Sequence, residues 1–338
     1  GLLSLRILLN YYQSKWRHFR SREALQQYQE QPVEQFLKSI LPLSPYTQER
    51  FHNHSISEWR SVPIIGKKQM MDNFDRLNTI GINKAEALAL AKQDESSRSF
   101  ESHLDGIAIG LSSGTSGTLG MFIASEKEQQ EWAGTILAKT LPDPLLWPKK
   151  DRIAFFLRAN SPLYEKTNSS RIQFCYFDLI EPLEQQLDRL QQLNPTILVA
   201  PPSLLRQLAL RIQAQTLTLH PNRVISVAEP LDPIDHQLLE TTFSQTIHQI
   251  YQATEGFLGA TCQHGTLHLN EDTLVIEREY LDETRFVPIV TDFRRTSQPI
   301  IRYRLDDVLQ LRDTPCPCGS VLTALQAIEG RQGDIILS

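Results

Sequence analysis

A run of small and hydroxylated residues is the first part of the sequence whose types and spacing could do chemistry. It reads Ser112-Ser113-Gly114-Thr115-Ser116-Gly117-Thr118 and directly follows a short apolar segment, residues 107–111. Glycines let the main chain approach a ligand closely, and hydroxyls together with main-chain N–H groups can surround a polyphosphate. The loop lacks the Gly-Lys-Ser/Thr ending of the P-loop, which disfavours the NTPases that carry it. Taken alone, the segment fits a phosphate site and a flexible polar turn about equally well.

Cysteines and histidines form a second candidate group. Only one proline separates Cys316 from Cys318, and two thiols this close do not readily form a mutual disulfide but can share a metal ion. The segment from Cys262 to His268 offers a further thiol and the imidazoles of His264 and His268. The alternative is that Cys262 is a small buried apolar residue and the Cys-Pro-Cys turn is inert. The fourth cysteine, Cys175, lies in an aromatic segment and is expected in the core.

The composition excludes several functional classes. With 338 residues and 41% hydrophobic side chains, the chain can bury a large core. Its net charge is -5, so it has no basic excess for a nucleic-acid backbone or an anionic membrane, and nucleic acid is not expected as a partner. The apolar opening is too short to span a membrane and contains Arg6, so we interpret it as a packed helix. Four unevenly placed cysteines are not a disulfide framework, and a reducing cytoplasm fits best.

The elements that must position these residues follow from the hydrophobic pattern. Helical spacing dominates from Leu2 to about Met71, with expected stops at Pro32, Pro42, Pro45 and Pro63. Residues 107–111 are expected to form a buried strand that leads into the hydroxyl-rich loop. Beyond it the pattern predicts helices over residues 126–140, 183–193, 203–213 and 233–243, and strands over residues 152–157, 196–200 and 223–228. Shorter strands are expected over residues 274–278, 288–291, 300–303 and 308–311.

This alternation predicts an α/β fold with mainly parallel sheets flanked by helices and a smaller β-rich subdomain. We expect a large domain over residues 1–331. Within it, residues 1–105 form a helical N-terminal region, residues 106–250 the α/β part, and residues 251–331 the β-rich part.

Five segments, in this order, resemble the motifs of the adenylate-forming superfamily of acyl-coenzyme A ligases, luciferases and peptide-synthetase adenylation domains. They are Ser112 to Gly117, Ser226 to Leu231, Tyr251 to Glu255, Arg302 to Asp307 and Gly330 to Asp334. The resemblance runs from about Ile107 to the end of the chain, and five ordered motifs are far more specific than any one of them.

The resemblance implies a role for each motif in binding ATP and Mg²⁺. The stretch Ala228-Glu229-Pro230 would lie along the adenine, Tyr251 would stack on the base, and Thr254 would contact phosphate. Because a carboxylate that attacks ATP meets like charge, the site needs Mg²⁺, which Glu255 would hold, and donors from the hydroxyl-rich loop. Asp307 suits the two ribose hydroxyls, since an ionised carboxylate accepts two hydrogen bonds at once. As isolated residues, both acids would be expected to be ordinary solvated carboxylates, and the motif context reverses that expectation.

We therefore assign Glu255 and Thr254 as catalytic. The expected nucleotide-binding residues are Ser112, Ser113, Gly114, Thr115, Ser116, Gly117, Ala228, Glu229, Pro230, Tyr251, Thr254, Asp307 and Arg331.

The segment from Pro299 to Asp307, with Pro315-Cys316-Pro317-Cys318-Gly319, most resembles phenylacetate-coenzyme A ligase and its relatives. Relatives in that branch pair these regions around zinc, which implies Cys262, His268, Cys316 and Cys318 as ligands, with His264 as the substitute nitrogen. Three sulfurs and one nitrogen leave no position for water, so such a zinc would be structural. Zinc is favoured over the inert alternative.

Three features depart from the superfamily pattern. The hydroxyl-rich loop is followed by Thr118-Leu119-Gly120-Met121 and has no lysine, so phosphate charge must be met elsewhere or pyrophosphate handling differs. The position two after Arg331 is Gly333, with Asp334 one step later, so the hinge acid is displaced. Residues 332–338 would begin the hinge, and the C-terminal lid, with its lysine, is absent. We expect the chain to be truncated there and to turn over poorly as it stands.

The sequence therefore predicts an ATP-dependent ligase that converts a carboxylic acid to its acyl-adenylate and then to a thioester with coenzyme A or a carrier thiol. The alternative is a non-catalytic nucleotide-binding or scaffold protein that keeps the fold, and a homodimer is left open. Aromatic side chains could line the acyl pocket, although such clusters are more often plain core. They are Phe155, Phe156, Tyr164, Phe174 and Tyr176.

Overall fold

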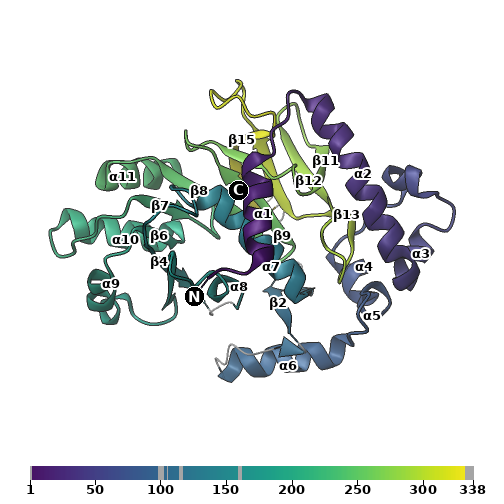
Figure 1. The fold of residues 1–338 in the computed structure, drawn as a ribbon, viewed down its shortest axis with the longest axis horizontal. Coiled ribbons are helices and arrows are strands. Elements are labelled where there is room, and N and C mark those ends of the chain that lie inside the picture. The colour runs from purple at the N-terminus through teal and green to yellow at the C-terminus, as the bar shows by residue number, and fades with distance from the viewer. Residues whose placement is uncertain (1, 98–102, 105, 114–116, 159–161, 332–338) are drawn as a thin grey trace. The chain divides into compact units, whose positions relative to one another are not determined.

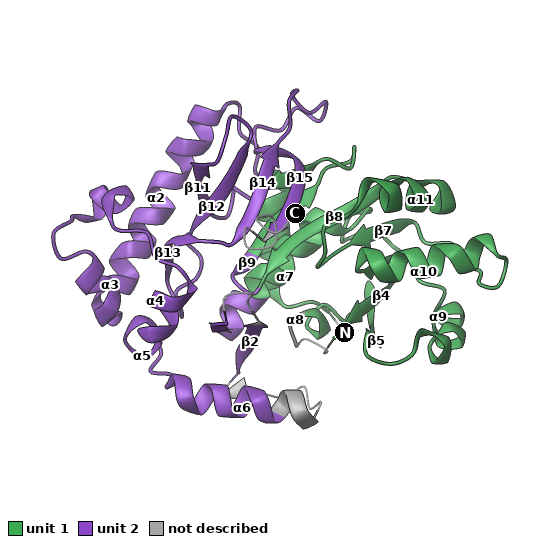
Figure 2. Cartoon of the chain, turned by 180° about the vertical axis from the view of Figure 1, so that it is seen from behind, with its two compact units in different colours: residues 1–16, 130–253, 257–268 green, residues 17–129, 254–256, 269–338 purple. Residues whose placement is uncertain are grey.

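The computed structural model describes residues 2–97, 103–104, 106–113, 117–158 and 162–331 (Figure 1). The chain forms two compact units (Figure 2). Unit 1 comprises Gly1–Trp16, Gln130–Ala253 and Phe257–His268, and unit 2 comprises Arg17–Gln129, Thr254–Gly256 and Leu269–Ser338. Among the described residues, no helix has the length and apolar character needed to cross a membrane.

Unit 1 is built on a parallel sheet. Its strands run in the order β5-β4-β6-β7-β8, and every neighbouring pair in this order is parallel. These strands are β4 (Asp151–Leu157), β5 (Ile172–Asp178), β6 (Ile197–Ala200), β7 (Arg223–Ser226) and β8 (Ile247–Ala253). β9 (Gly256–Thr261) and β10 (Leu267–Leu269) follow β8 in the sheet order. The helices are α1 (Leu5–Trp16), α7 (Glu126–Thr140), α8 (Pro162–Glu165), α9 (Leu187–Leu193), α10 (Pro202–Gln213) and α11 (Pro233–Phe243).

Two apolar cores cover the two faces of this sheet. Side chains alternate along a strand, so Phe155 joins the core that α1 and α7 cover, and Phe156 joins the core under α9, α10 and α11. Strands buried on both faces are apolar throughout, as β6 is. Because these strands are parallel, their carboxyl ends lie at one edge of the sheet, where ligands bind in open α/β folds.

Unit 2 joins an N-terminal set of helices to antiparallel strands. The helices are α2 (Arg22–Ile40), η1 (Leu41–Leu43), α3 (Pro45–Arg50), η2 (Ile56–Ser61), α4 (Lys67–Asp72), α5 (Phe74–Leu77) and α6 (Lys84–Ser97). β1 (His103–Leu104), β2 (Ile107–Ser113) and β3 (Leu119–Ala124) form a small antiparallel sheet. β11 (Val275–Tyr280), β12 (Arg285–Asp292), β14 (Asp307–Leu311) and β15 (Ala324–Arg331) pair antiparallel in this order, and β13 (Ile300–Arg304) pairs with β12.

Most of the expected elements are present, and two expectations were wrong. Residues 126–140 and 233–243 are helical as predicted. However, α2 continues through Pro32 instead of stopping there. The proline removes one helical hydrogen bond, but Phe36 and Leu37 on the following turns pack into a core with Trp59, which holds the helix together. The strand over residues 107–111 was expected to be buried, yet its side chains are half-buried, because it belongs to a small sheet of three strands.

Candidate functional site

The hydroxyl-rich loop connects the antiparallel strands β2 and β3 of unit 2. Ser112 ends β2 opposite Gly120 of β3. The Ser112 hydroxyl is buried and has no hydrogen-bond partner among the described residues. Gly117 has φ +77°, a conformation that favours glycine. Of the predicted loop residues, Gly114, Thr115 and Ser116 lie outside the described residues, as does the side chain of Ser113.

Lys67 lies beside this loop, and the sequence pattern did not single it out. It is the first residue of α4 and is half-buried. A Cβ on Gly120 would overlap the Ser112 hydroxyl and would lie 3.4 Å from Cδ of Lys67. Gly120 therefore lets a hydroxyl and a lysine side chain approach the same point. Its ammonium acts electrostatically on Glu255, the nearby buried acid.

Glu255 is buried next to this group. Its side chain is 8% exposed, and its carboxylate accepts hydrogen bonds from the hydroxyls of Tyr303 and Thr254, both at 3.3 Å. Burial raises the pKa of Glu255. Its own main-chain N–H and the charge of Lys67 lower that pKa, while the nearby acid Asp307 raises it. Two acids and one lysine thus share an electrostatic environment in which a divalent cation would favour the ionised form of Glu255.

Asp307 and Thr254 complete the part of the site that lies in unit 2. Asp307 begins β14 and is paired in the sheet with Arg331 of β15, whose side chain lies outside the described residues. A Cβ on Gly110 of β2 would lie 3.7 Å from Cγ2 of Thr254, so the strand before the loop runs beside Thr254. The structure therefore brings Thr254, Glu255, Asp307 and the Ser112 end of the loop together within one unit.

Arg295 connects the segments that form this cluster, and no sequence motif identified it. It is 1% exposed, and Nη1 donates to the main-chain oxygens of Glu255 (2.9 Å) and Thr254 (3.3 Å). Nη2 donates to the main-chain oxygen of Ile123 in β3 at 2.7 Å. The buried acids Glu128, Asp292 and Glu255 offset its charge. One guanidinium therefore ties the segment that carries Glu255 to the strand that follows the loop.

The expected adenine-binding residues lie in unit 1, at the carboxyl ends of β7 and β8. Ala228, Glu229 and Pro230 follow β7 and are exposed. Ala228 has φ +70°, a left-handed conformation that is uncommon for a residue with a side chain and is often found at functional sites. The Glu229 carboxylate accepts a hydrogen bond from the Ser203 hydroxyl at 2.7 Å. Tyr251 lies on β8, the strand parallel to β7, and is 6% exposed.

The five aromatic residues considered for an acyl pocket divide between the two faces of the unit 1 sheet. The ring centroids of Phe155 and Tyr164 are 4.7 Å apart, and those of Tyr164 and Phe174 are 5.5 Å apart. Tyr164 donates to the side-chain oxygen of Gln252 at 2.8 Å, and burial raises the pKa of Tyr164 to about 12. Phe156 instead stacks on a phenylalanine in the opposite core. Only the first face therefore bears on the segment that carries Tyr251.

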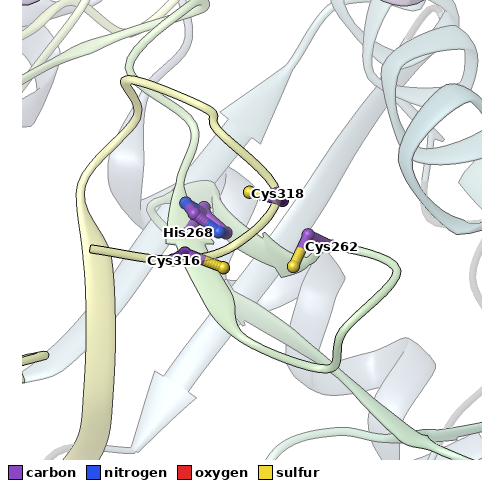
Figure 3. A group of neighbouring side chains, drawn as sticks. All are labelled: Cys262, His268, Cys316 and Cys318. Carbon is purple, nitrogen blue, oxygen red and sulfur yellow. The ribbon is translucent and has the colours of Figure 1, made fainter. Parts of the chain in front are cut away.

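The predicted metal ligands form one cluster. The ligand atoms of Cys262, His268, Cys316 and Cys318 all lie within 4.8 Å of one another. Figure 3 shows these four side chains grouped together. A turn in which the Gly319 N–H donates to the Cys316 carbonyl at 3.1 Å presents the last two thiols. Three sulfurs and one nitrogen at this spacing suit a tetrahedral zinc ion. His264, the substitute nitrogen, is exposed and is not among the four. Cys175 is half-buried and packs at the edge of a core.

The chain was compared with protein-family models, curated proteins and solved structures. No protein-family model matches the chain. Protein CapK of Staphylococcus aureus is 26% identical over 195 residues, which cover 56% of this chain and 42% of CapK. The chain thus matches less than half the length of this curated relative.

Solved structures of a 2-hydroxyisobutyryl-CoA ligase are similar over most of the chain. The open conformation, in complex with 2-HIB-AMP and CoA, has a TM-score of 0.66 at 15% identity and covers 90% of this chain and 74% of the ligase chain. The postadenylation state, in complex with 2-HIB-AMP, has a TM-score of 0.68 at 14% identity and covers 90% of this chain and 67% of the other. Likeness at this level of identity shows the fold, and the predicted α/β fold class is confirmed.

Proposed function

We propose that this chain, which has the fold of the adenylate-forming enzymes, activates a carboxylic acid with ATP. The observation that carries the proposal is the cluster around Glu255. It contains a buried acid, a second acid, a lysine and the Ser112 hydroxyl, which has no hydrogen-bond partner among the described residues. The described donors to the Glu255 carboxylate are two hydroxyls and its own main-chain N–H. None of them is a cation, which suits an ion that arrives with a substrate.

Each residue contributes to one step of that reaction. A carboxylate oxygen of the acid attacks the α-phosphorus of ATP, the bond to the β-phosphate breaks, and pyrophosphate leaves. Mg²⁺, when bound, would neutralise the charge that builds up on the phosphates. Glu255 would hold this ion, the Ser112 hydroxyl and the rest of the loop would donate to phosphate oxygens, and Thr254 would position the phosphate. Asp307 would bind the ribose hydroxyls, and Tyr251 with Ala228, Glu229 and Pro230 would bind the adenine.

Lys67 would supply the phosphate charge that the loop itself lacks. The adenylate-forming pattern expects a lysine after the loop, and this chain has Leu119, Gly120 and Met121 there. The Lys67 side chain approaches Gly120 and lowers the pKa of Glu255, so its ammonium acts on the same small region. A compact ammonium is suited to this role because it is a point charge that binds phosphate oxygens.

The second half of the reaction would transfer the acyl group to a thiol. A thiolate of coenzyme A or of a carrier protein attacks the carbonyl carbon of the adenylate, and AMP leaves. A crystal structure of the 2-hydroxyisobutyryl-CoA ligase contains 2-HIB-AMP and CoA, which supports coenzyme A as the acceptor. The aromatic group formed by Phe155, Tyr164 and Phe174 is our candidate for the acyl side of the site.

Exchange of labelled pyrophosphate into ATP, measured on the complete protein over a panel of carboxylic acids, tests the proposal. We expect acid-dependent exchange that falls about 10²–10³-fold in Glu255→Ala, the range for loss of one transition-state charge contact. Asp188→Asn, an exposed acid on α9, is the matched control and should exchange normally. Exchange that persists in Glu255→Ala would remove the assignment. Binding of AMP with no acid-dependent exchange would favour a non-catalytic nucleotide-binding protein.

Lys67 can be tested against its own neighbour. Lys67→Met should raise the KM for ATP at least about tenfold, because a cation beside a phosphate contributes more than 1.4 kcal/mol. Lys68 is the matched control, since its side chain is 78% exposed and pairs with Asp72. If Lys67→Met and Lys68→Met give the same KM, the charge of the phosphates is met by another residue.

We also propose that Cys262, His268, Cys316 and Cys318 hold a structural zinc ion, which their grouping of three sulfurs and one nitrogen supports. Elemental analysis of the purified protein should give about one zinc per chain. Cys316→Ser should lose the metal and lower the unfolding temperature, while Cys175→Ser should keep it. Less than about half an equivalent of zinc would contradict this ligand set.

A further inference from the structure

Helix α1 presents a row of large apolar side chains to solvent. Leu5 is 72% exposed, Leu9 53% and Trp16 75%. At 3.6 residues per turn, these three side chains leave the helix within about 40° of one another. Leu2, just before the helix, is 93% exposed. A folded protein seldom leaves so many large apolar side chains uncovered on one stripe, so this face is expected to be covered by something.

The opposite face of α1 is already packed. Ile7 is 1% and Tyr11 2% exposed in a core shared with α7. The Tyr11 hydroxyl accepts a hydrogen bond from the Leu145 N–H at 3.1 Å. Gly134 of α7 lies directly under the helix, because a Cβ there would lie 2.5 Å from the Ile7 carbonyl oxygen. The helix is therefore fixed in rotation, and its outer face cannot roll inward to bury the leucines.

Cations border the exposed stripe on both sides. Arg6 and Lys15 are exposed and, by helical geometry, lie roughly 80–100° on either side of Leu5. Residues 1–16, which end with α1, contain Arg6 and Lys15 and no Asp or Glu, whereas the whole chain has a net charge of -5. The overall charge therefore conceals a basic segment at the apolar helix. An apolar face with leucine and tryptophan, edged by Lys and Arg, is typical of helices that lie in a membrane interface.

We propose that the outer face of α1 docks on an anionic lipid surface. The leucines and Trp16 would enter the boundary between headgroups and acyl chains, and Arg6 and Lys15 would bind lipid phosphates. The helix is too short to cross a bilayer, so it would lie along the surface. This inference does not depend on the proposed enzymatic activity.

The same charges disfavour a second copy of the chain as the partner. If α1 paired antiparallel with its equivalent about a twofold axis, Leu5 would meet Trp16 of the other copy, but Arg6 would meet Lys15 of that copy. With no acid in residues 1–16, nothing in this segment would offset the repulsion. Like charges side by side on paired helices are destabilising. An anionic surface satisfies the apolar stripe and both cations together.

Co-sedimentation of the purified full chain with vesicles tests the proposal. We expect binding to phosphatidylcholine vesicles that contain phosphatidylglycerol, weaker binding to phosphatidylcholine alone, and release at high salt. Arg6→Gln and Lys15→Gln should each weaken binding to the anionic vesicles about fivefold. Leu5→Ser with Leu9→Ser should weaken it by roughly tenfold or more per leucine.

A matched control comes from the same unit. Ile234 on α11 is 79% exposed and Leu210 on α10 is 51% exposed, so Ile234→Ser with Leu210→Ser removes similar apolar surface elsewhere and should leave binding unchanged. Failure of the wild type to bind anionic vesicles would overturn the proposal, as would equal loss in the control. Light scattering supplies the remaining outcome: a dimer that Leu5→Ser with Leu9→Ser converts to a monomer would mean that a second copy covers the stripe.

Discussion

Two buried acids, one in each unit, differ in whether an arginine is bonded to the carboxylate. Asp151 of β4 is fully buried and accepts hydrogen bonds from Arg171 Nη1 at 2.5 Å and Thr196 Oγ1 at 2.8 Å. Burial alone would raise the pKa of Asp151, but the bonds and charge from Arg171 outweigh it, so the pKa is lowered. Glu255 is nearly as buried, has only hydroxyls within hydrogen-bond reach among the described side chains, and has a raised pKa because of burial.

The two buried arginines show the same difference. In unit 1, the Arg171 guanidinium bonds directly to the carboxylate of Asp151 and satisfies it. In unit 2, the Arg295 guanidinium bonds to main-chain oxygens of Thr254 and Glu255 and leaves the Glu255 carboxylate to other partners. A structural acid such as Asp151 is bonded to a cation of the protein itself. A functional acid such as Glu255 is held in position but would bind a cation that comes with the ligand.

The largest expected effect is at the structural acid. Asp151→Ala should lower the free energy of unfolding by about 3–5 kcal/mol, because it leaves the buried Arg171 without its partner. The measurement is urea denaturation. Asp143→Asn is the control, since its partly exposed pair with Lys149 should contribute at most about 1 kcal/mol. A loss below about 1 kcal/mol for Asp151→Ala would contradict the structural role of Asp151, because its pair with Arg171 would then not be needed for folding.

Substitution of Arg295 should give the next largest effect. It distinguishes a role in positioning Glu255 from a purely structural role. Arg295→Lys keeps the charge but cannot reach all three carbonyls, so about 1–3 kcal/mol of stability should be lost. In the exchange assay, the Mg²⁺ concentration for half-maximal rate should rise several-fold, while the KM for the carboxylic acid stays constant. A purely structural role would reduce the amount of folded protein without changing either constant. Arg189→Lys, on a surface site in unit 1, is the control.

Gly120→Ala should have a smaller and more local effect. The added methyl group would overlap the Ser112 hydroxyl and crowd Lys67, so about 1–2 kcal/mol should be lost through overpacking. We expect the KM for ATP to rise more than kcat falls, because both displaced groups are proposed to bind phosphate. The change is measured in the exchange assay at varied ATP. A variant with the wild-type KM for ATP would show that neither group contacts the nucleotide.

The sequence predicted the fold best where the hydrophobic pattern is regular and local. Helices over residues 126–140 and 233–243 were predicted with their bounds, and α10, whose apolar residues recur most clearly at helical spacing, was predicted to within one residue. β5 was not predicted, since both faces of Ile172–Asp178 are apolar and aromatic and no alternation marks a strand. Continuation of α2 through Pro32 was missed because tertiary packing, which no local pattern reveals, compensates for the lost hydrogen bond.

The candidate site was predictable only where its residues carry motifs. Glu255 and the four metal-ligand candidates could be named in advance because their segments resemble motifs of the adenylate-forming superfamily and of its phenylacetate-coenzyme A ligase branch. Lys67 and Arg295 lie in segments that carry no recognisable motif, and only the fold brings them to Gly120 and Glu255. The missing lysine after the loop indicated that another cation must bind the phosphates. The sequence alone did not identify Lys67 as that cation.

The smallest effect has the most distinctive sign. Because the pKa of Glu255 is raised by burial, its ionised form costs stability in the ligand-free protein, and the cost grows as pH rises from its ordinary value of 4.5. Glu255→Gln should therefore raise the free energy of unfolding at neutral pH by roughly 0.5–2 kcal/mol, although it abolishes exchange. Asp151 must behave oppositely: its lowered pKa contributes stability above its ordinary value of 3.8 that is lost as pH falls. Urea denaturation at several pH values, with Mg²⁺ absent, measures both differences. If Glu255→Gln is destabilising at neutral pH, Glu255 has a cation partner of its own and belongs with Asp151.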